Sequence, residues 1–337
     1  MTKLVEFAGG DALRKALTKS VRDLDDLKRS RAQLVDAVYQ AAHDAASAVT
    51  YAPVRAPKRD ARSKSPEIAV VALSDFQLGK LTPDYDSKKC AERVALLARK
   101  VAQLTAIQRA DHPVKEVRVY LLGDLVEGEL IFPGQAYRID ASLFRQVMVD
   151  GPQILGDFLR AMLAIFETVR VVGVIGNHGQ IGGRSWKDSH PETNADSMMY
   201  ETTRIMLAGE KRLDFAPVIT SGERHWFATD TIGAKTFFLF HGNQVKSQLG
   251  YASYGMGKKL LGWYQAVEPF DYALSGHFHT PGRGLYGKVT HWQNGSTESS
   301  NTYAQEWMAA SGTPSQWLLF CSPEHGVSAE YEVHLDG

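Results

Sequence analysis

Polar residues that can bind metal ions follow five short apolar runs along the chain. The first run is followed by Asp75 and Gln77, and the second by Asp124 in the sequence GDLVEGE. The other three runs add an asparagine and four histidines, which are Asn177, His178, His241, His277 and His279. Carboxylate and amide oxygens combined with imidazole nitrogens suit divalent ions such as Mn, Fe or Zn. A carboxylate such as Asp124 can bridge two ions about 3.5–4 Å apart, an arrangement that activates water against a phosphoryl centre.

The five runs have the composition of β-strands. They cover residues 68–73, 117–122, 169–175, 235–241 and 270–275. Helical patterns fill 88–109, 141–167 and 194–209, and shorter strand-like runs follow near 213–219, 224–229, 288–293 and 328–334. Strands that alternate with helices predict a layered α/β domain, and the later runs predict added antiparallel strands, hence mixed sheets. Because ligands bind at the carboxyl ends of strands in such sheets, the five polar clusters are expected to converge.

The composition is that of one large soluble domain or two ordinary ones. The chain has 337 residues, 44% of them hydrophobic, and its 38 Lys and Arg residues balance its 38 Asp and Glu residues. This balance implies no polyanionic partner for the chain as a whole. Cys90 and Cys321 are far apart and do not look like a disulfide framework, which favours a reducing cytoplasm. The N-terminus lacks an apolar signal-peptide core and no apolar run approaches ~18 residues, so we expect a soluble protein that is not exported and has no membrane partner.

Two segments are expected before a main domain at 67–337. Residues 1–50 contain a heptad-like stripe of apolar or small side chains, which are Leu17, Leu24, Leu27, Leu34, Val38, Ala41, Ala45 and Ala48. This stripe predicts a long, coiled-coil-like helix that either packs along the main domain or forms a homo-oligomer or binds a partner protein. Residues 51–66 are basic and Pro-rich, which predicts a linker that is either a solvated tether or a contact for a phosphate backbone.

The ordered series D-x-Q, GDLVE, GNHG, HG and GHFH resembles the calcineurin-like metallophosphoesterase superfamily, whose pattern is D-x-H, GD, GNH, H and GHxH. The resemblance extends over residues 68–295. It implies a four-layer α/β sandwich of mixed β-sheets flanked by helices, here preceded by the long N-terminal helix. The GDLxE, GNH and GHFHT forms are most similar to Mre11/SbcD nucleases and to phage proteins called DNA repair exonucleases.

The resemblance also implies a role for each ligand. One ion would be held by Asp75, Asp124 and His279, with Gln77 in the place of a histidine ligand. The other would be held by Asp124, Asn177, His241 and His277. His178 would contact the phosphate and assist departure of the leaving oxygen, so that His178 and Asp124 are the catalytic residues. The implied reaction is in-line attack of a metal-held hydroxide on a phosphodiester, with two Mn ions expected and Mg, Fe or Zn as alternatives.

Two positions depart from the family pattern. Gln77 is a neutral and weaker donor than histidine, which implies either a looser first site that prefers Mn or Mg, or a vacant site with impaired catalysis. The sequence GNHG lacks the acidic residue that often follows GNH, which leaves His178 without an assigned partner to orient it. Glu127 stands where the nucleases often carry a histidine, and it either supports a neighbouring side chain or faces an incoming cation.

Two segments that follow ligand motifs, 128–146 and 182–190, are expected to shape the substrate site. Their aromatic and basic members are Phe132, Arg138, Arg145, Arg184, Trp186 and Lys187. In the second segment, Arg184, Trp186 and Lys187 combine phosphate-binding charge with base stacking, which suits single-stranded or frayed nucleic acid. An ordinary exposed loop is the alternative interpretation.

The favoured function is a DNA nuclease or exonuclease that acts in DNA repair or processing, with DNA as its substrate. One alternative is a phosphatase or phosphodiesterase acting on a small molecule or a protein, because the metal core does not set the substrate. The other is a catalytically impaired scaffold, for which Gln77 is the main evidence. The expected location is the cytoplasm, which would be that of the host if the protein is phage-encoded.

Overall fold

The structure of the protein is a computed structural model that describes residues 51–132, 134–181, 191–216, 226–246, 252–299 and 313–336, together with scattered positions between 18 and 48. The chain forms two units, Met1–Ala45 and Ala46–Gly337. In the first unit the described residues are helical and their side chains are exposed. Most of the heptad-like stripe lies outside the described residues. The role of this helix in assembly therefore stays a prediction.

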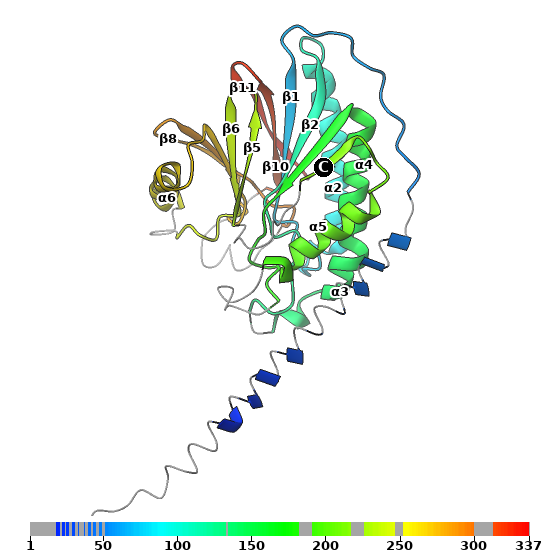
Figure 1. The fold of residues 1–337 in the computed structure, drawn as a ribbon, viewed down its shortest axis with the longest axis vertical. Helices are drawn as coiled ribbons and strands as arrows, with labels where there is room; N and C mark the ends of the chain where they lie inside the picture. The colour runs from blue at the N-terminus through cyan, green and yellow to red at the C-terminus, as the bar shows by residue number, and fades with distance from the viewer. Residues whose placement is uncertain are drawn as a thin grey trace, which may run out of the picture. The chain divides into compact units, whose positions relative to one another are not determined.

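Six strands form the first sheet of the second unit (Figure 1). They are β1 (Glu67–Leu73), β2 (Val114–Leu121), β3 (Thr168–Gly173), β4 (Leu213–Phe215), β10 (Ser315–Ser322) and β11 (Gly326–His334). Their spatial order is β11-β10-β1-β2-β3-β4; β1 to β4 are parallel, whereas β10 is antiparallel to both of its neighbours. The carboxyl ends of β1, β2 and β3 therefore lie side by side at one end of the sheet.

Five strands form the second sheet. They are β5 (Phe227–Ile232), β6 (Lys235–Phe240), β7 (Tyr272–Ser275), β8 (Gly282–Tyr286) and β9 (Val289–Gln293), in the spatial order β5-β6-β7-β9-β8. β6, β7 and β9 are parallel, and the edge strands β5 and β8 are antiparallel. One core joins the two sheets: Val70, Tyr120 and Val172 of the first sheet pack with Phe237 and Trp292 of the second. The two sheets therefore form a sandwich.

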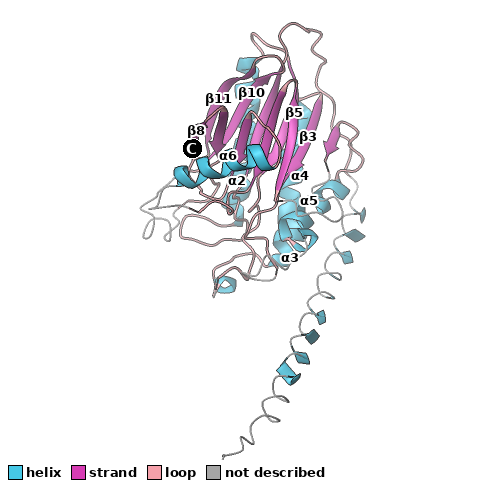
Figure 2. Ribbon diagram, turned by 60° about the vertical axis from the view of Figure 1, so that its left-hand side comes forward, coloured by secondary structure: helices cyan, strands magenta, loops and turns pink. Residues whose placement is uncertain are grey.

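Helices cover the outer faces of both sheets (Figures 1 and 2). α2 (Ser87–Gln108), α4 (Gly151–Ile165) and α5 (Ala195–Met206) lie beside the first sheet, and α6 (Ala252–Ala266) lies beside the second. Met256 and Leu260 of α6 pack with Phe238 and Phe240 of β6. The layers are helix, sheet, sheet and helix, which confirms the predicted α/β sandwich of two mixed sheets. Among the helices of the described residues, none is both long enough and apolar enough to span a bilayer.

Several elements differ from the sequence prediction. The single helix predicted for 141–167 is divided into α3 (Leu143–Arg145), a π-helical turn at Gln146–Asp150, and α4. The interruption coincides with Gln146, whose buried side chain accepts a hydrogen bond from the backbone of Gly128 at 2.9 Å. The pattern also gives no prediction of α6, β8, β10 or the short 3-10 turns Gln135–Tyr137 and Pro191–Thr193. β10 lacks the alternation of apolar and polar residues that marks a half-buried strand, because almost every one of its side chains is buried.

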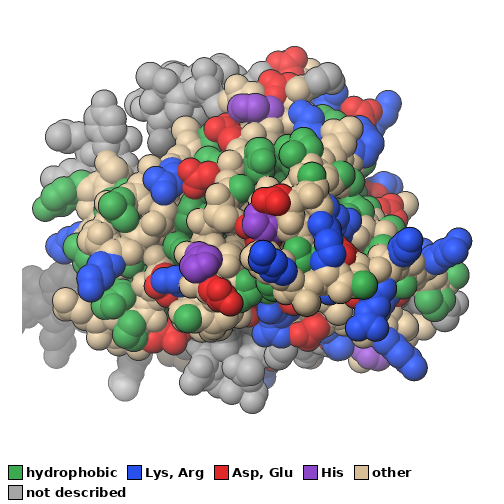
Figure 3. All heavy atoms as spheres, turned by 90° about the horizontal axis from the view of Figure 1, so that it is seen from above, with side chains coloured by type: hydrophobic (Ala, Val, Ile, Leu, Met, Phe, Trp, Pro, Cys, Tyr) green, Lys and Arg blue, Asp and Glu red, His purple; other side chains and the backbone are tan. Residues whose placement is uncertain are grey.

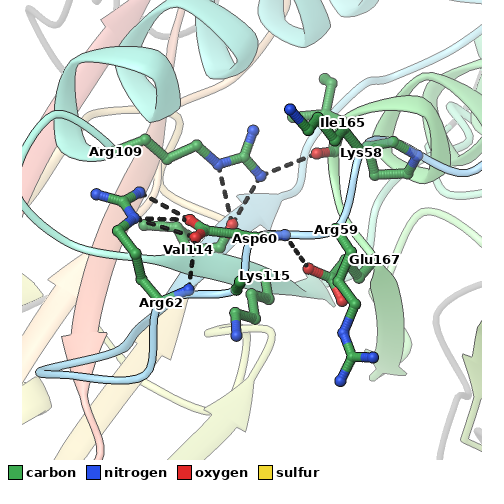
Figure 4. A pocket seen from close by; sticks show the side chains of 11 residues that line it. Lys58, Arg59, Asp60, Arg62, Arg109, Val114, Lys115, Ile165 and Glu167 are labelled. Atoms are coloured by element: carbon green, nitrogen blue, oxygen red, sulfur yellow. Dashed lines mark hydrogen bonds and ion pairs between the residues drawn. The ribbon is translucent and has the colours of Figure 1, made fainter.

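Segment 51–66 passes over the end of the sheet at which β1, β2 and β3 begin (Figure 1). The backbone nitrogen of Val54 donates to Glu210 at 2.7 Å, and that of Asp60 donates to Glu167 at 3.0 Å. Arg62 pairs with Asp60, and these residues line a pocket of about 480 Å³ (Figure 4). The basic, Pro-rich composition is compatible with a solvated tether, but carboxylates of the domain bind its backbone and anchor it.

The surface seen from above carries charges of both signs. Figure 3 shows Lys and Arg side chains lying among Asp and Glu side chains on the coloured part of this face. The pocket in Figure 4 has the same mixed character, because its cations lie beside the carboxylates of Asp60 and Glu167. Contact between this segment and a phosphate backbone stays a prediction.

Candidate metal centre

The residues assigned to the second ion converge in the structure. Ligand atoms of Asp124, His241 and His277 all lie within 4.8 Å of one another. His241 Nε2 is 2.9 Å from Asp124 Oδ2 and 3.2 Å from Asn177 Oδ1. These side chains follow β2, β3, β6 and β7, so they come from both sheets of the sandwich. The arrangement offers one divalent ion two oxygens and two imidazole nitrogens.

The residues assigned to the first ion also lie together. Nε2 of His279 is 3.3 Å from Oδ1 of Asp75 and 3.5 Å from the amide nitrogen of Gln77. Two ligands that bind one ion at about 2.1–2.3 Å and at right angles are about 3 Å apart, so the separation between His279 and Asp75 matches a shared ion. The site can therefore accept an ion after small side-chain shifts.

The amide oxygen of Gln77 provides a second indication that the site takes a cation. Gln77 is completely buried, and its Oε1 has no hydrogen-bond donor among the described residues. A buried carbonyl oxygen without a partner is uncommon and unfavourable. A divalent ion bound between Asp75 and His279 would give this oxygen a partner. The chemistry of the donor set thus fits a metal at both positions.

The backbone at these positions is unusual. Among the described residues, six that are not glycine have positive φ, namely Ser65, Asp75, Gln77, Asp124, His277 and His279. Five of them are the ligands proposed from sequence. A left-handed residue other than glycine costs on the order of 1–3 kcal/mol, and such strain persists where the surrounding structure enforces it. Gln77 has the same backbone geometry as the ligands on either side of it.

Two glycines allow the loops to approach each other closely. A Cβ at Gly176 would lie 2.1 Å from Oδ1 of Asp124, and one at Gly276 would lie 2.4 Å from Oδ2 of Asp75. Any side chain at either position would displace a carboxylate of the site. The glycines of GNHG and GHFH are therefore required by the closeness of the neighbouring ligand.

Hydrogen bonds fix which nitrogen each histidine presents. Nδ1 of His241 is 2.7 Å from the carbonyl oxygen of Leu122, and Nδ1 of His279 is 2.7 Å from Oε1 of Glu298. Both partners only accept, so Nδ1 carries a proton and donates it in each case. Nε2 of each ring then faces the ligand cluster, which is the orientation that metal binding needs.

The charges of the site are strongly coupled. Burial alone would lower the pKa of His241, but Asp124 beside it raises that pKa to about 9. Burial is likewise outweighed at His279, where Glu298 and Asp75 raise the pKa to about 10. At His277, burial and the charge of His241 outweigh the opposite effect of Asp124 and Asp75, and they lower the pKa to about 3. Without metal, His241 and His279 are therefore imidazolium ions that offset the negative charge of Asp124, Asp75 and Glu298.

Asp196, at the start of α5, is a residue of the site that the motifs do not indicate. Its carboxylate accepts hydrogen bonds from the backbone nitrogens of Asp124 at 2.9 Å, Leu125 at 3.0 Å and Gly176 at 2.8 Å. Burial, reinforced by the charge of Asp124, raises the pKa of Asp196 to about 6. The only sequence signal is its place near a helix N-terminus, which is common to many aspartates. Asp196 ties the loops after β2 and β3 together.

The turn Asn294–Glu298 supports the first position. Ser296 Oγ donates to the carbonyl oxygen of Asp75 at 2.8 Å, and the amide of Asn294 donates to Ser74 Oγ at 2.9 Å. These residues and Glu298 are buried. The NGS sequence is conspicuous after the last ligands, but only the fold reveals that it wraps around the Asp75 loop.

Glu127 contacts His178 and so supplies the acidic group that GNHG lacks. Nδ1 of His178 lies 3.3 Å from Oε2 of Glu127 and 3.0 Å from its backbone oxygen. The backbone nitrogen of His178 donates to Oδ1 of Asp124 at 2.7 Å. Burial lowers the pKa of His178, but Asp124 and Glu127 outweigh this effect and raise it to about 9.

The expected substrate residues are only partly described. Arg184, Trp186 and Lys187 lie outside the described residues, in 182–190. In 128–146, Arg138 is exposed, whereas Arg145 pairs with Asp150 at 2.9 Å. Contact between these residues and a substrate stays a prediction.

Comparison with known proteins gives structural neighbours only. No protein-family model and no curated protein matches the sequence. An archaeal phosphodiesterase is 11% identical with a TM-score of 0.36, over 79% of this chain and 99% of its own. A predicted phosphoesterase from Streptococcus pneumoniae is 14% identical with a TM-score of 0.30, over 79% and 98%. Vps29 from Entamoeba histolytica, complexed with zinc, is 13% identical with a TM-score of 0.30, over 80% and 99%. At this level of similarity, only the chain's own residues bear on its activity.

Proposed function

We propose that this protein is a dinuclear metal-dependent phosphodiesterase. The observation that carries the proposal is the convergence of seven donors, five of them on left-handed backbone, into two neighbouring groups, between which Asp124 would be shared. These donors are Asp75, Gln77, Asp124, Asn177, His241, His277 and His279. When bound, a pair of divalent ions supplies an activated water and neutralises charge on the phosphoryl oxygens.

His178 is the side chain best placed to meet the substrate. It adjoins Asn177 but is not needed as a ligand, and its side chain is 19% exposed, whereas that of His241 is fully buried. Glu127 binds Nδ1, which leaves Nε2 to face a phosphodiester beside the two ions. From there the imidazolium can hold a phosphoryl oxygen or give a proton to the departing alkoxide.

Glu127 is itself held in place for this task. Its side chain is 2% exposed, and Gln135 donates to its Oε1 at 3.0 Å and to its backbone oxygen at 2.8 Å. Gln135 is completely buried, so it cannot turn away without losing both bonds. The orientation of His178 is therefore built from the segment after GD instead of from the residue after GNH.

The substrate we propose is DNA, which would make the protein a nuclease similar to the Mre11/SbcD or phage exonucleases. Tyr137 is 93% exposed and Phe144 is 52% exposed, and Arg138 lies between them in the sequence. Their segment is bound to the loop that follows Gln77, because Leu81 donates to the backbone of Arg138 at 3.0 Å. Exposed rings beside a cation favour unstacked bases with an adjoining phosphate.

The test is hydrolysis of a set of phosphoesters by the full chain with Mn²⁺. We expect turnover of bis(p-nitrophenyl) phosphate and of single-stranded DNA, and little turnover of p-nitrophenyl phosphate. A preference for the monoester would instead support a phosphatase. If the chain binds Mn²⁺ and hydrolyses none of these compounds, the scaffold alternative is correct and our proposal is wrong.

The DNA part of the proposal has its own test. Replacing Tyr137 with Ala should weaken binding of an oligo-dT roughly 5- to 150-fold, because one stacked base contributes about 1–3 kcal/mol. Tyr254→Ala is the matched control, since Tyr254 is 70% exposed on α6. Fluorescence anisotropy measures both variants. Equal binding by both would remove the support that Tyr137 gives to a nucleic-acid substrate.

For the N-terminal helix we propose assembly with another copy of the chain or with a partner protein. Its heptad-like stripe and the division of Met1–Ala45 from the rest of the chain as a unit of its own support this role. Deleting residues 1–45 keeps the anchored segment 51–66, and it should lower the number of chains per particle measured by light scattering while diester hydrolysis persists. An unchanged number of chains would contradict self-association.

A further inference from the structure

Glu298 lies at the end of the buried turn that follows β9, and no motif assigns it a role. Its side chain is 3% exposed; one oxygen is 2.7 Å from Nδ1 of His279, and the other pairs with Nζ of Lys80. We propose that Glu298, held by Lys80, is a positioning residue for the first metal position. It orients His279 and strengthens it as a ligand where Gln77 is a weak one. The inference rests on the proposed function only in taking His279 as a ligand.

The carboxylate of Glu298 determines which nitrogen His279 presents. A carboxylate accepts hydrogen bonds and cannot donate one, so Nδ1 must carry the proton. Nε2 is thereby left to face Oδ1 of Asp75, 3.3 Å away. With Nδ1 bound to a buried partner, the ring cannot flip without leaving the charge of Glu298 incompletely paired.

Lys80 connects this pair to the weak ligand. Its backbone nitrogen donates to the carbonyl oxygen of Gln77 at 3.0 Å, so both residues belong to one turn. The side chain of Lys80 is 17% exposed, and its ammonium group reaches the oxygen of Glu298 that does not bind His279. The turn that presents Gln77 therefore also fixes the partner of His279.

The turn that carries Glu298 is also hydrogen-bonded to Asp75, the remaining ligand of the first position. Ser296 Oγ donates to the carbonyl oxygen of Asp75 at 2.8 Å and accepts from the backbone nitrogen of Glu298 at 2.9 Å. One hydroxyl thus sets the distance between Asp75 and Glu298. The three ligands that belong only to the first position are thus connected. The Lys80–Glu298 pair links Gln77 to His279, and Ser296 links Asp75 to Glu298.

The second position is supported in a different way. There, Nδ1 of His241 donates to the neutral carbonyl oxygen of Leu122 at 2.7 Å. A charged partner makes an imidazole a stronger donor than a neutral one does, and losing a partner of this kind typically lowers metal affinity 10- to 100-fold. The carboxylate partner thus occurs at the position that has a single imidazole ligand, whereas the second position has two, His241 and His277. Added donor strength in that one imidazole therefore has the greater effect.

The experiment is calorimetric titration of the full chain with Mn²⁺. The wild type should bind two ions, and Glu298→Gln should weaken one of them about 10- to 100-fold while the other keeps its affinity. Lys80→Met should weaken the same ion by a smaller factor. ¹⁵N NMR of the imidazoles with diamagnetic Zn²⁺ bound should show His279 protonated at Nδ1 in the wild type and no longer uniformly so in Glu298→Ala.

Glu67→Gln is the matched control. Glu67 is 3% exposed, accepts hydrogen bonds from Gln108 and Ser328, and lies at the opposite end of β1. It should lose stability without any change in Mn²⁺ binding. The inference is wrong if Glu298→Gln binds both ions as the wild type does, or if Glu298→Gln and Glu67→Gln weaken both ions alike.

The outcomes also separate this inference from the proposed function. If no diester is hydrolysed but Glu298→Gln weakens one ion selectively, the positioning role stands and the proposed function fails. If diesters are hydrolysed and Glu298→Gln leaves both affinities unchanged, the proposed function stands and the positioning role fails.

Discussion

The two ends of β1, β2 and β3 differ in how their polar groups are satisfied. At the carboxyl ends, Asp75, Gln77 and Asp124 have left-handed backbone, and the buried oxygen of Gln77 has no donor among the described residues. At the opposite end, Arg109 donates to the carbonyl oxygens of Val114 and Ile165 at 2.6 and 2.9 Å, and Asp60 pairs with Arg62. The polar groups named at the opposite end are paired with one another in the folded chain. At the carboxyl ends, the oxygen of Gln77 is not paired with any described residue.

This difference separates residues that stabilise the fold from residues that serve a ligand. Groups that pair with one another lower the free energy of the folded chain directly. Strained groups that converge without complete pairing raise it, and they persist because neighbouring residues such as Asp196 hold them. Substitutions at the carboxyl ends should therefore change activity or metal binding more than stability. Substitutions at the opposite end should lower stability and leave activity unchanged.

The largest effect is expected for His178→Ala. Turnover of a diester should fall about 10²- to 10⁴-fold, and more for an alkoxide leaving group than for nitrophenolate, because only the poor leaving group needs a proton. Steady-state kinetics on two diesters and metal analysis check this, and both ions should be retained. His334→Ala is the control, since His334 is exposed on β11. Unchanged turnover in His178→Ala would exclude the proposed mechanism.

Metal binding should depend steeply on pH. The raised pKa values of His241, about 9, and His279, about 10, mean that both rings are protonated near neutral pH without metal. An ion must displace both protons, so affinity rises with pH below those values, by about tenfold per pH unit for each proton released. His277 contributes nothing, because its pKa of about 3 leaves it neutral. Titrations in buffers of different ionisation enthalpy count the protons, and a count of zero contradicts this assignment.

Gln77→His should have a moderate effect confined to the first position. An imidazole is a stronger donor than an amide, so we expect roughly tenfold tighter Mn²⁺ binding there and a wider range of metals that support turnover. The measurement is Mn²⁺ titration combined with activity in Mn²⁺, Zn²⁺ and Mg²⁺. Identical titrations for both proteins would mean that the side chain at position 77 does not reach the ion.

The smallest effect on the site is expected from the opposite end. Arg109→Ala removes charged hydrogen bonds to Val114 and Ile165 and the contact of the guanidinium with the Phe166 ring, so the free energy of unfolding should drop by about 1–3 kcal/mol. Mn²⁺ affinity and turnover should not change. Denaturant unfolding measures the loss of stability, and altered metal binding would show that the two ends are coupled.

The sequence was sufficient to predict the fold class and the convergence of the ligands, for a physical reason. Each ligand group directly follows an apolar run, and parallel strands bring their carboxyl ends together whatever the loops do. Asp196 and Glu298 could not be found in this way, because each acts through a contact between segments remote in sequence. β10 could not be predicted from the sequence either, because a strand buried on both faces has no alternating pattern of apolar and polar residues. Whether the ligands bind metal stays a prediction.

The position of β10 has a consequence for how the protein is made. β10 pairs with β1, so that Ile68 meets Cys321, and Gln316 accepts a hydrogen bond from the backbone nitrogen of Ser74 at 2.9 Å. While a ribosome is still producing the middle of the chain, β1 can pair with β2 but keeps an open, apolar edge on its other side. Contacts over such a long stretch of sequence also form slowly. Chains released before residue 315 should therefore aggregate through β1, and the Asp75 loop acquires its final support only once β10 has been synthesised.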